Sequence, residues 1–261
     1  MSEYHDAMMK MLELIWGPGF MAPGGEGNVA KLVDGLSIRG RRILDIGSGL
    51  GGPAFVLVEQ YGAVVVGIDL EPHLVEIAAR RCREKGLEAR AEFRTVEPGR
   101  LPFPDDSFDV VLSSGALTQI EDKEALFRDC LRVLHPGGTL TCYDWMKPEG
   151  EYSQDMRYWF KMEGLTYNME TPARCEEMLK AAGFVDITIV DRSDWYRRRA
   201  RTEYEMITTD LHGRMVELLG QRDADHFVEN WRAMVVVCDK GEMLQVYSRA
   251  RKPLGSGQNT K

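Results

Sequence analysis

The stretch Arg42-Ile-Leu-Asp-Ile-Gly-Ser-Gly-Leu-Gly-Gly52 decides the fold. It begins with a short, mostly apolar run, which is typical of a buried strand. Glycines follow at once, and Gly47, Gly49 and Gly52 match the pattern G-x-G-x-x-G. Because glycine has no Cβ, this backbone can turn tightly and come close to a ligand. A helical pattern continues over residues 53–60, so the stretch predicts a strand, a ligand-binding turn and a helix.

The acid ahead of the glycines separates two interpretations of this turn. Dinucleotide folds use the same glycine spacing to place a pyrophosphate at a helix N-terminus. A carboxylate at Asp45 suits that ligand badly, because it would lie near two phosphate charges. It suits a ligand that carries an ammonium and a sulfonium. The turn therefore favours S-adenosyl-L-methionine as cofactor, with S-adenosyl-L-homocysteine as its product.

Apolar strands and helices alternate after the turn. The second strand, over residues 63–69, ends in Asp69, which lies 20 residues past Gly49. An acid at this place can accept hydrogen bonds from ribose hydroxyls. Further strands are expected at 89–93, 108–113, 139–144, 185–191 and 243–250, and helices at 72–85, 122–134 and 171–182. This alternation predicts an α/β, Rossmann-like fold with a mostly parallel seven-stranded sheet and helices on both faces.

The later part of the chain carries insertions. Thr171 is the expected N-cap of a helix, with Pro172 at its first position and Gly183 at its end. Residues 194–236 read as two helices broken near Gly220. A strand that enters last, after such an insert, is expected to be antiparallel and to lie at the sheet edge.

We expect one domain over residues 1–253. Its expected parts are an N-terminal lid segment (1–24), a cofactor-binding core (25–145), a helical substrate lid (146–170) and the rest of the sheet with its helical insert (171–253). Residues 254–261 are expected to form a flexible tail.

Composition excludes several classes of function. The 261 residues can build one substantial core. The net charge of −8 argues against a nucleic-acid-binding surface. No apolar run has membrane-span length, and the N-terminus has no signal-peptide pattern. Five scattered cysteines and five histidines show no metal-ligand spacing. We expect a cytoplasmic monomer or homodimer without metal, nucleic acid or stable membrane association.

Several motifs together resemble the class I S-adenosylmethionine-dependent methyltransferases. In chain order they are residues 45–51, Asp69, Leu101-Pro-Phe103, Phe108-Asp-Val-Val111 and Leu134-His-Pro-Gly-Gly138. Trp16-Gly-Pro-Gly-Phe-Met-Ala-Pro-Gly-Gly25 and the run from Ala182 to Tyr247 are similar to phosphoethanolamine N-methyltransferases. The resemblance covers about residues 4 to 252.

The resemblance implies a set of cofactor contacts. The residues concerned are Asp45, Gly47, Ser48, Gly49, Gly51, Asp69, Leu70, Glu97 and Ser113. The glycines would let the backbone pass the methionine part, and Asp69 would hold the ribose. Leu70 would pack near the adenine, and Glu97 would contact the adenine amino group. Ser113 would lie beside the reacting methyl.

The resemblance also implies an acceptor site. Tyr4 would cover the bound amine and take part in the reaction, and Gln119 stands where the family has a histidine paired with that tyrosine. Ser114 follows Ser113 at the end of the fourth strand. Trp16, Trp145 and Tyr167 are expected to surround the nitrogen through cation–π contacts, together with Tyr4.

The chain departs from the family where the family binds phosphate. Trp145 replaces the clamp tyrosine, the clamp arginine falls near Gly164 or Leu165, and the clamp lysine has no clear match near Gly241. Because a buried dianion needs charged donors, these changes disfavour phosphoethanolamine. The expected reaction is therefore methyl transfer to the nitrogen of a small polar amine that is amino-acid-, betaine- or phosphoethanolamine-like.

Other functions stay open at this point. A methyltransferase acting on oxygen, sulfur or carbon of a small or lipid-like metabolite would want a broad apolar lid, whereas residues 146–168 are mixed in character. A nicotinamide-dependent oxidoreductase fits Asp45 poorly. A non-catalytic protein that binds S-adenosylmethionine has the same cofactor motif, and only product formation separates it from an enzyme.

Overall fold

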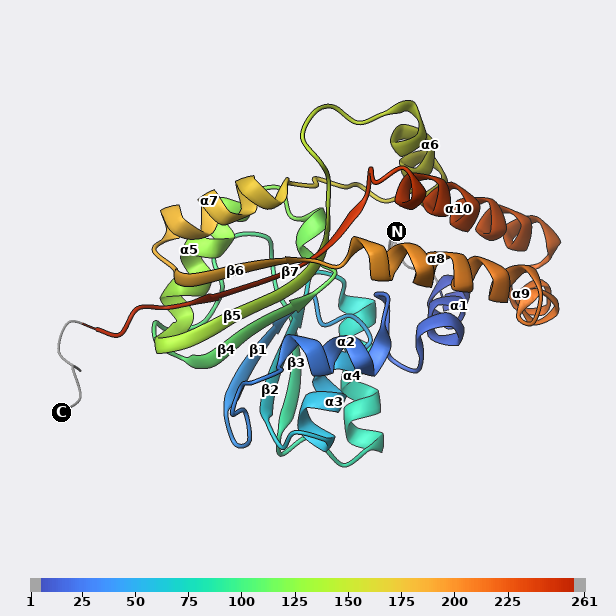
Figure 1. Ribbon diagram of the computed structural model, residues 1–261. Helices are drawn as coiled ribbons and strands as arrows, with labels where there is room; N and C mark the ends of the chain where they lie inside the picture. Colours follow the sequence, from blue (N-terminus) through green and yellow to red (C-terminus); the bar gives the residue numbers. More distant parts are fainter. Residues whose placement is uncertain (1–5, 256–261) are drawn as a thin grey trace.

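A seven-stranded sheet forms the centre of the molecule in the computed structural model, which describes residues 6–255 (Figure 1). The strand order is β3-β2-β1-β4-β5-β7-β6. Six strands are parallel, and β7 is antiparallel to both of its neighbours. The strands are β1 (Arg42–Ile46), β2 (Val64–Asp69), β3 (Ala91–Thr95), β4 (Phe108–Ser114), β5 (Leu134–Met146), β6 (Val185–Asp191) and β7 (Leu244–Arg251).

Helices cover both faces of the sheet because alternate strand residues point to opposite sides. On β1, Ile43 packs into one buried cluster, whereas Leu44 and Ile46 pack into another. The first cluster includes residues of α2 (Gly25–Leu32) and α3 (Gly52–Glu59), and α4 (Pro72–Glu84) packs against β2 and β3. The second includes residues of α5 (Lys123–Val133) and α7 (Pro172–Ala182). A short 3-10 helix, η1 (Leu117–Gln119), follows β4.

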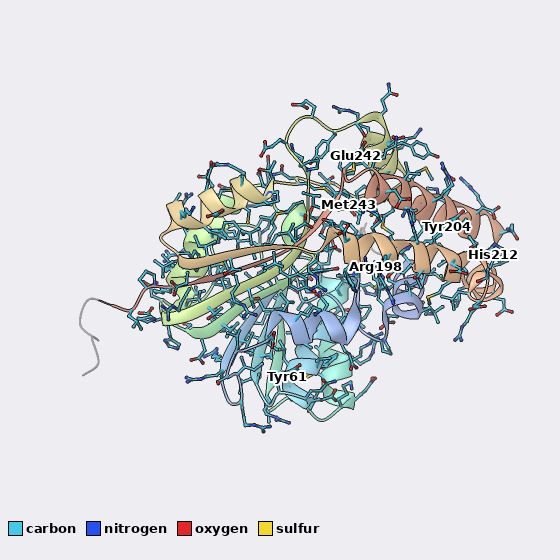
Figure 2. The ribbon with its side chains drawn as sticks, in the orientation of Figure 1. Tyr61, Arg198, Tyr204, His212, Glu242 and Met243 are labelled. Atoms are coloured by element: carbon cyan, nitrogen blue, oxygen red, sulfur yellow. The ribbon has the colours of Figure 1, made fainter. Side chains whose placement is uncertain are left out.

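Five further helices gather beside the sheet, and we call them the helical layer (Figure 1). They are α1 (Asp6–Trp16), α6 (Gln154–Glu163), α8 (Ser193–Thr208), α9 (His212–Leu219) and α10 (Gln221–Asp239). Figure 2 places Tyr204 and His212 in this layer, and Glu242 and Met243 where α10 leads into β7. At that junction Glu242 accepts a hydrogen bond from Ser153, the N-cap of α6. The layer is thus tied to the end of the sheet.

The fold class predicted from the sequence is confirmed, as are several local features. Thr171 caps α7 by accepting a hydrogen bond from Arg174. Pro172 begins α7, and Gly183 ends it in a left-handed conformation.

Three details of the prediction were wrong. The last strand is antiparallel, but it lies between β5 and β6, so β6 is the edge strand. The third strand covers Ala91–Thr95 and not 89–93, because the chain turns before it, where the N–H groups of Arg90 and Ala91 both donate to the carbonyl of Leu87. Residues 194–236 contain three helices, since the chain breaks at 209–211 as well as at Gly220. Thr208 and Thr209 accompany the first break, where their hydroxyls bond to carbonyls of the preceding helical turn.

Candidate active site

The glycine turn leaves β1 at the carboxyl end of the sheet. The N–H groups of Gly47 and Ser48 both donate to the carbonyl of Ile68, at 2.9 and 3.0 Å, which holds the turn against β2. Gly47 has a φ of 72°, and a Cβ there would collide with the Cβ of Ala116. Glycine is therefore required at this position both by backbone conformation and by space.

The segment that follows α1 lies against the same turn. The carbonyl of Gly19 accepts a hydrogen bond of 3.0 Å from the N–H of Gly52. The sulfur of Met21 lies 3.1 Å from where a Cβ of Gly49 would be. The described part of the N-terminal segment thus packs against the glycine turn.

Asp45 is fully buried, and neither of its carboxylate oxygens has a hydrogen-bond partner among the described residues. Burial, and after it the charge of Asp69, raises the pKa of Asp45 to about 7. A buried carboxyl group without partners is costly. A ligand ammonium at this place would supply both a hydrogen-bond donor and a compensating charge. The site therefore fits the amino end of the cofactor that the sequence favours.

Asp69 ends β2 and holds the glycine turn from the other side. Its carboxylate accepts hydrogen bonds from the N–H groups of Gly49, at 2.8 Å, and Glu71, at 3.1 Å. Burial raises its pKa, and these backbone bonds oppose the rise. Next to it Leu70 is 51% exposed, and Glu97 is exposed two residues beyond β3, so both are accessible to a ligand at this edge.

The other predicted cofactor residues take part in packing or in hydrogen bonds of the protein itself. A Cβ at Gly51 would lie 2.8 Å from the ring of Phe55, so this glycine allows close packing. The hydroxyl of Ser113 donates to the carbonyl of Ile46 at 3.0 Å, which links β4 to β1. Ser48 is buried, and its hydroxyl has no partner in the described part of the chain.

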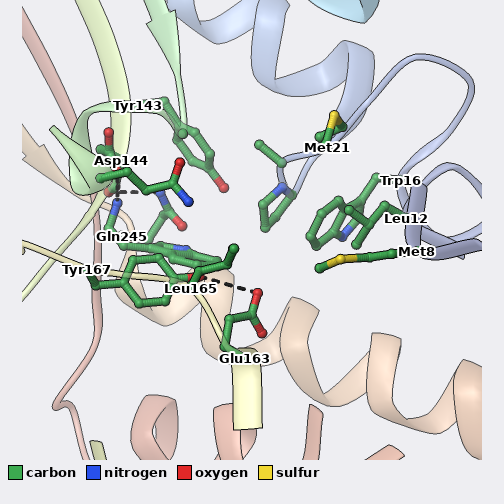
Figure 3. A pocket seen from close by; sticks show the side chains of 15 residues that line it. Met8, Leu12, Trp16, Met21, Tyr143, Asp144, Glu163, Leu165, Tyr167 and Gln245 are labelled. Atoms are coloured by element: carbon green, nitrogen blue, oxygen red, sulfur yellow. Dashed lines mark hydrogen bonds between the residues drawn. The ribbon is translucent and has the colours of Figure 1, made fainter. Parts of the chain in front are cut away.

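A cavity of about 50 Å³ lies beside the glycine turn, and we call it the central cavity (Figure 3). This space is several times the roughly 10–15 Å³ that one water molecule needs. Met21 lines it, and the sulfur of Met21 lies 3.1 Å from where a Cβ of Gly49 would be, so Met21 borders both the cavity and the turn. The lining residues are Met8, Leu12, Trp16, Met21, Ala22, Pro23, Gly115, Gln119, Tyr143, Asp144, Trp145, Glu163, Leu165, Tyr167 and Gln245.

Four residues predicted for the acceptor site meet at the central cavity, namely Trp16, Gln119, Trp145 and Tyr167. Ser114 is not among the lining residues, and its hydroxyl accepts a hydrogen bond of 3.1 Å from Asn28. Tyr4 lies outside the described residues.

Aromatic rings form one wall of the central cavity. The ring of Trp145 meets Trp159 and Tyr167 edge-on, with centroids 5.4 and 5.8 Å apart. Tyr167 stacks on Trp159 at 5.0 Å. Such a wall offers π faces to a cation.

Two acids are among the residues that line the central cavity. Asp144 accepts hydrogen bonds from the N–H groups of Thr118, at 3.0 Å, and Trp145, at 2.7 Å, and burial raises its pKa to about 7. Glu163 accepts from Tyr167 at 3.3 Å and from Asn230, and burial raises its pKa as well. None of the described lining residues is lysine or arginine. The cavity suits a cation better than an anion.

A buried glutamate holds Trp16, one of the residues that line the cavity, in place. Glu203 on α8 accepts hydrogen bonds from the indole N–H of Trp16, at 2.8 Å, and the guanidinium of Arg199, at 2.8 Å. It also accepts from Trp231 on α10, at 3.4 Å. These contacts join α1 to α8 and α10 within the helical layer and place Trp16 at the cavity.

Sequence reasoning missed four polar residues of the cavity, which are Tyr143, Asp144, Glu163 and Gln245. Asp144 and Tyr143 carried a usable signal, because they end an apolar strand at the ligand-binding edge. Gln245 carried none, since its place depends on the insertion of β7 beside β5.

The comparisons with known proteins agree with this geometry. Residues 44–142 match the family model described as "Methyltransferase domain". The chain therefore carries a class I methyltransferase domain. Phosphoethanolamine N-methyltransferase of Triticum aestivum is 31% identical over 231 residues, which are 88% of this chain and 45% of the relative. The chain thus spans about half the length of the plant relatives it matches.

Two further relatives extend the likeness. Phosphoethanolamine N-methyltransferase of Plasmodium falciparum is 28% identical over 212 residues, covering 79% of this chain and 77% of the relative. Phosphoethanolamine N-methyltransferase 2 of Haemonchus contortus, solved with phosphomonomethylethanolamine and S-adenosylhomocysteine, superposes with a TM-score of 0.89 at 26% identity. That match covers 97% of this chain and 59% of the Haemonchus chain.

Three features of residues 6–255 bear on other functions. No helix there is long and apolar enough to cross a membrane. No group of three or more His, Cys, Asp or Glu side chains could hold a metal ion in that range. All five cysteines are buried and unpaired.

Proposed function

We propose that this protein transfers a methyl group from S-adenosyl-L-methionine to the nitrogen of a small polar amine. The observation that carries the proposal is a cavity with an aromatic wall and two acids directly beside the glycine turn. The relatives from Triticum, Plasmodium and Haemonchus support it, because all three are N-methyltransferases of a small amine by name. We further propose the four parts predicted for the domain and its cytoplasmic location.

The glycine turn and its neighbours would hold the cofactor. Asp45 would pair with the ammonium of the methionine part, and the backbone at Gly47 and Gly49 would pass close to it. Asp69 would accept hydrogen bonds from the ribose. Leu70, Glu97, Ser48, Gly51 and Ser113 complete the proposed contacts. When bound, the cofactor supplies a methyl carbon made electrophilic by a sulfonium.

The residues of the central cavity would act mainly by position and by excluding water. Trp145, Tyr167 and Trp16 would surround the acceptor nitrogen, where positive charge grows as the new bond forms. An ammonium acceptor must first lose a proton, and Glu163 is suited to hold it because it lines the cavity and burial raises its pKa. Gln119 is not a base and would orient the amine. Ser114 does not line the cavity and would support the cavity wall from outside. Tyr4 would cover the amine.

The size and charge of the central cavity support some acceptor classes over others. At about 50 Å³ the cavity suits a small molecule better than a quinone or a sterol. A phosphate dianion would meet Glu163 without a lysine or arginine among the described lining residues. The site therefore favours an amine without phosphate, although the similar proteins are named for phosphoethanolamine.

An acceptor screen tests the proposal. The protein is incubated with S-adenosylmethionine labelled in its methyl group, and with phosphoethanolamine, ethanolamine, glycine, sarcosine or dimethylglycine. We expect label to enter an amine without phosphate. Cofactor binding without label transfer to any amine would instead favour a non-catalytic binder or a methyltransferase for oxygen, sulfur or carbon.

A further inference from the structure

Three uncharged side chains of the central cavity carry buried polar atoms without a hydrogen-bond partner among the described residues. These atoms are the hydroxyl of Tyr143, the indole nitrogen of Trp145 and the side-chain oxygen of Gln245. Tyr143 is 1% exposed and Gln245 is fully buried. Because leaving a buried polar atom unpaired is costly, three such atoms at one cavity point to a ligand.

The sheet brings these three side chains to one face. Tyr143 and Trp145 are two residues apart on β5, so they point to the same side. Gln245 on β7 is directly opposite Trp145, which places its side chain on that side too. Figure 3 shows the Tyr143 hydroxyl pointing into the cavity, with Gln245 beside Asp144. We call Tyr143, Trp145 and Gln245 the neutral wall.

The hydrogen-bonding role of each member is fixed by its surroundings. The indole N–H of Trp145 can only donate. Burial raises the pKa of Tyr143 well above its usual range, so its hydroxyl keeps its proton and can donate. The amide of Gln245 donates to the carbonyl of Asp144 at 2.9 Å. Since a carbonyl only accepts, the amide nitrogen faces it, and the Gln245 oxygen is left as an acceptor.

Two donors and one acceptor discriminate among the groups that an amine can carry. A carboxylate or a phosphate only accepts at neutral pH, so it would set its oxygens against the oxygen of Gln245. A hydroxyl accepts from Tyr143 or Trp145 and donates to Gln245 at the same time. An ammonium combined with a hydroxyl also carries a net positive charge, which complements the carboxyl group of Glu163.

We propose that the neutral wall binds a hydroxyl group of the acceptor, so that the substrate class is an unphosphorylated amino alcohol. This inference rests on the proposed function and assigns specificity to Tyr143, Trp145 and Gln245. A site built to bond a buried hydroxyl rejects analogues that lack it, because its own polar groups are then left unpaired.

A binding measurement tests the inference separately from catalysis. The protein is saturated with S-adenosylhomocysteine and titrated in a calorimeter with N-methylethanolamine, N-methylpropylamine, sarcosine or phosphoethanolamine. We expect N-methylethanolamine to bind at least about tenfold more tightly than N-methylpropylamine, which has a methyl in place of the hydroxyl. Preferred binding of sarcosine or phosphoethanolamine would overturn the inference while leaving amine methylation intact.

The variant Tyr143→Phe sharpens the test because it removes one oxygen and keeps the ring. It should weaken N-methylethanolamine binding about tenfold and leave N-methylpropylamine and S-adenosylhomocysteine binding unchanged. Tyr158→Phe is the matched control, since the Tyr158 hydroxyl is exposed and bonds to Glu229. An equal loss for both amines in Tyr143→Phe would overturn the assigned hydroxyl contact.

Methyl transfer then separates failure of the inference from failure of the function. We expect the labelled methyl group to enter N-methylethanolamine with a kcat/KM about tenfold above that for sarcosine. Transfer to sarcosine or phosphoethanolamine in preference would overturn the amino alcohol assignment alone. Absence of transfer to every amine, with the cofactor bound, would overturn the proposed function and this inference with it.

Discussion

The carboxylate of Asp69, at the end of β2, accepts a hydrogen bond of 2.8 Å from the backbone N–H of Gly49, in the turn that follows β1. The end of β2 and the glycine turn after β1 are therefore one structural unit. Asp69 has two roles if the proposed function holds, because the carboxylate that holds the turn would also face the ribose of the cofactor.

Replacing Asp69 with alanine should weaken cofactor binding more than it weakens the fold. Hydrogen bonds to the ribose are worth roughly 1.5–3 kcal/mol. Isothermal titration with S-adenosylmethionine measures this loss, and thermal unfolding measures the cost to the fold. Asp34→Ala is a control, because Asp34 is exposed and uses only its backbone carbonyl to bind Arg249. Unchanged affinity in Asp69→Ala would remove the ribose assignment.

Asp45→Asn should stabilise the protein without cofactor at neutral pH. Because the pKa of Asp45 is raised from 3.8 to about 7, the folded state holds this proton more tightly than the unfolded state. Stability linked to Asp45 is therefore complete below pH 4 and is lost as pH rises toward 7, by up to about 1.4 kcal/mol per pH unit. Asparagine does not titrate, so the unfolding free energy of Asp45→Asn should exceed that of the wild-type protein by a growing amount over this range.

Urea unfolding of both proteins from pH 4 to 8 measures this difference, and the comparison cancels the parallel titration of Asp144. The same substitution should weaken S-adenosylmethionine binding, since the ammonium loses its counter-charge. A stability difference that does not change with pH would show that Asp45 titrates normally in the folded protein.

Glu203→Gln should loosen the attachment of α1. The glutamate is fully buried and accepts from Trp16, Arg199 and Trp231. An amide accepts fewer of these bonds and leaves its own N–H groups unpaired, at a cost of about 1–3 kcal/mol in unfolding free energy. Glu205→Gln is the matched control, because Glu205 is an exposed residue of the same helix. Equal stability of the two variants would contradict the role assigned to Glu203.

Tyr4→Phe should slow methyl transfer more than it weakens cofactor binding, if the tyrosine hydroxyl contacts the acceptor amine. Single-turnover rates and calorimetry give the two quantities. Tyr158→Phe is again the control for loss of a phenol elsewhere. A parallel loss of rate and cofactor affinity would indicate that Tyr4 acts only as part of a cover.

The features predicted best from the sequence are those that depend on neighbouring residues. The glycine turn, the acid at the end of β2 and the cap Thr171 are local patterns, so their place in the structure follows from residues within a few positions. The fold class follows from them because apolar strands separated by helices leave few other arrangements.

The features that were missed depend on contacts between distant segments. Gln245 reaches the cavity because β7 pairs with β5, so that Gln245 lies opposite Trp145 after an insertion of three helices. Glu203 gave no signal as one acid in a charged helix, and it is buried because Trp16 and Trp231 approach it from α1 and α10. Such pairings are set by tertiary packing and leave no periodic trace in the sequence.

Calorimetric titration of the wild-type protein with S-adenosylmethionine, and in parallel with NAD, tests the central claim most directly. We predict saturable binding of S-adenosylmethionine, lost or strongly weakened in Asp69→Ala, and no binding of NAD. Binding of NAD, or no binding of S-adenosylmethionine by the folded protein, would contradict the assignment of the glycine turn to a sulfonium donor.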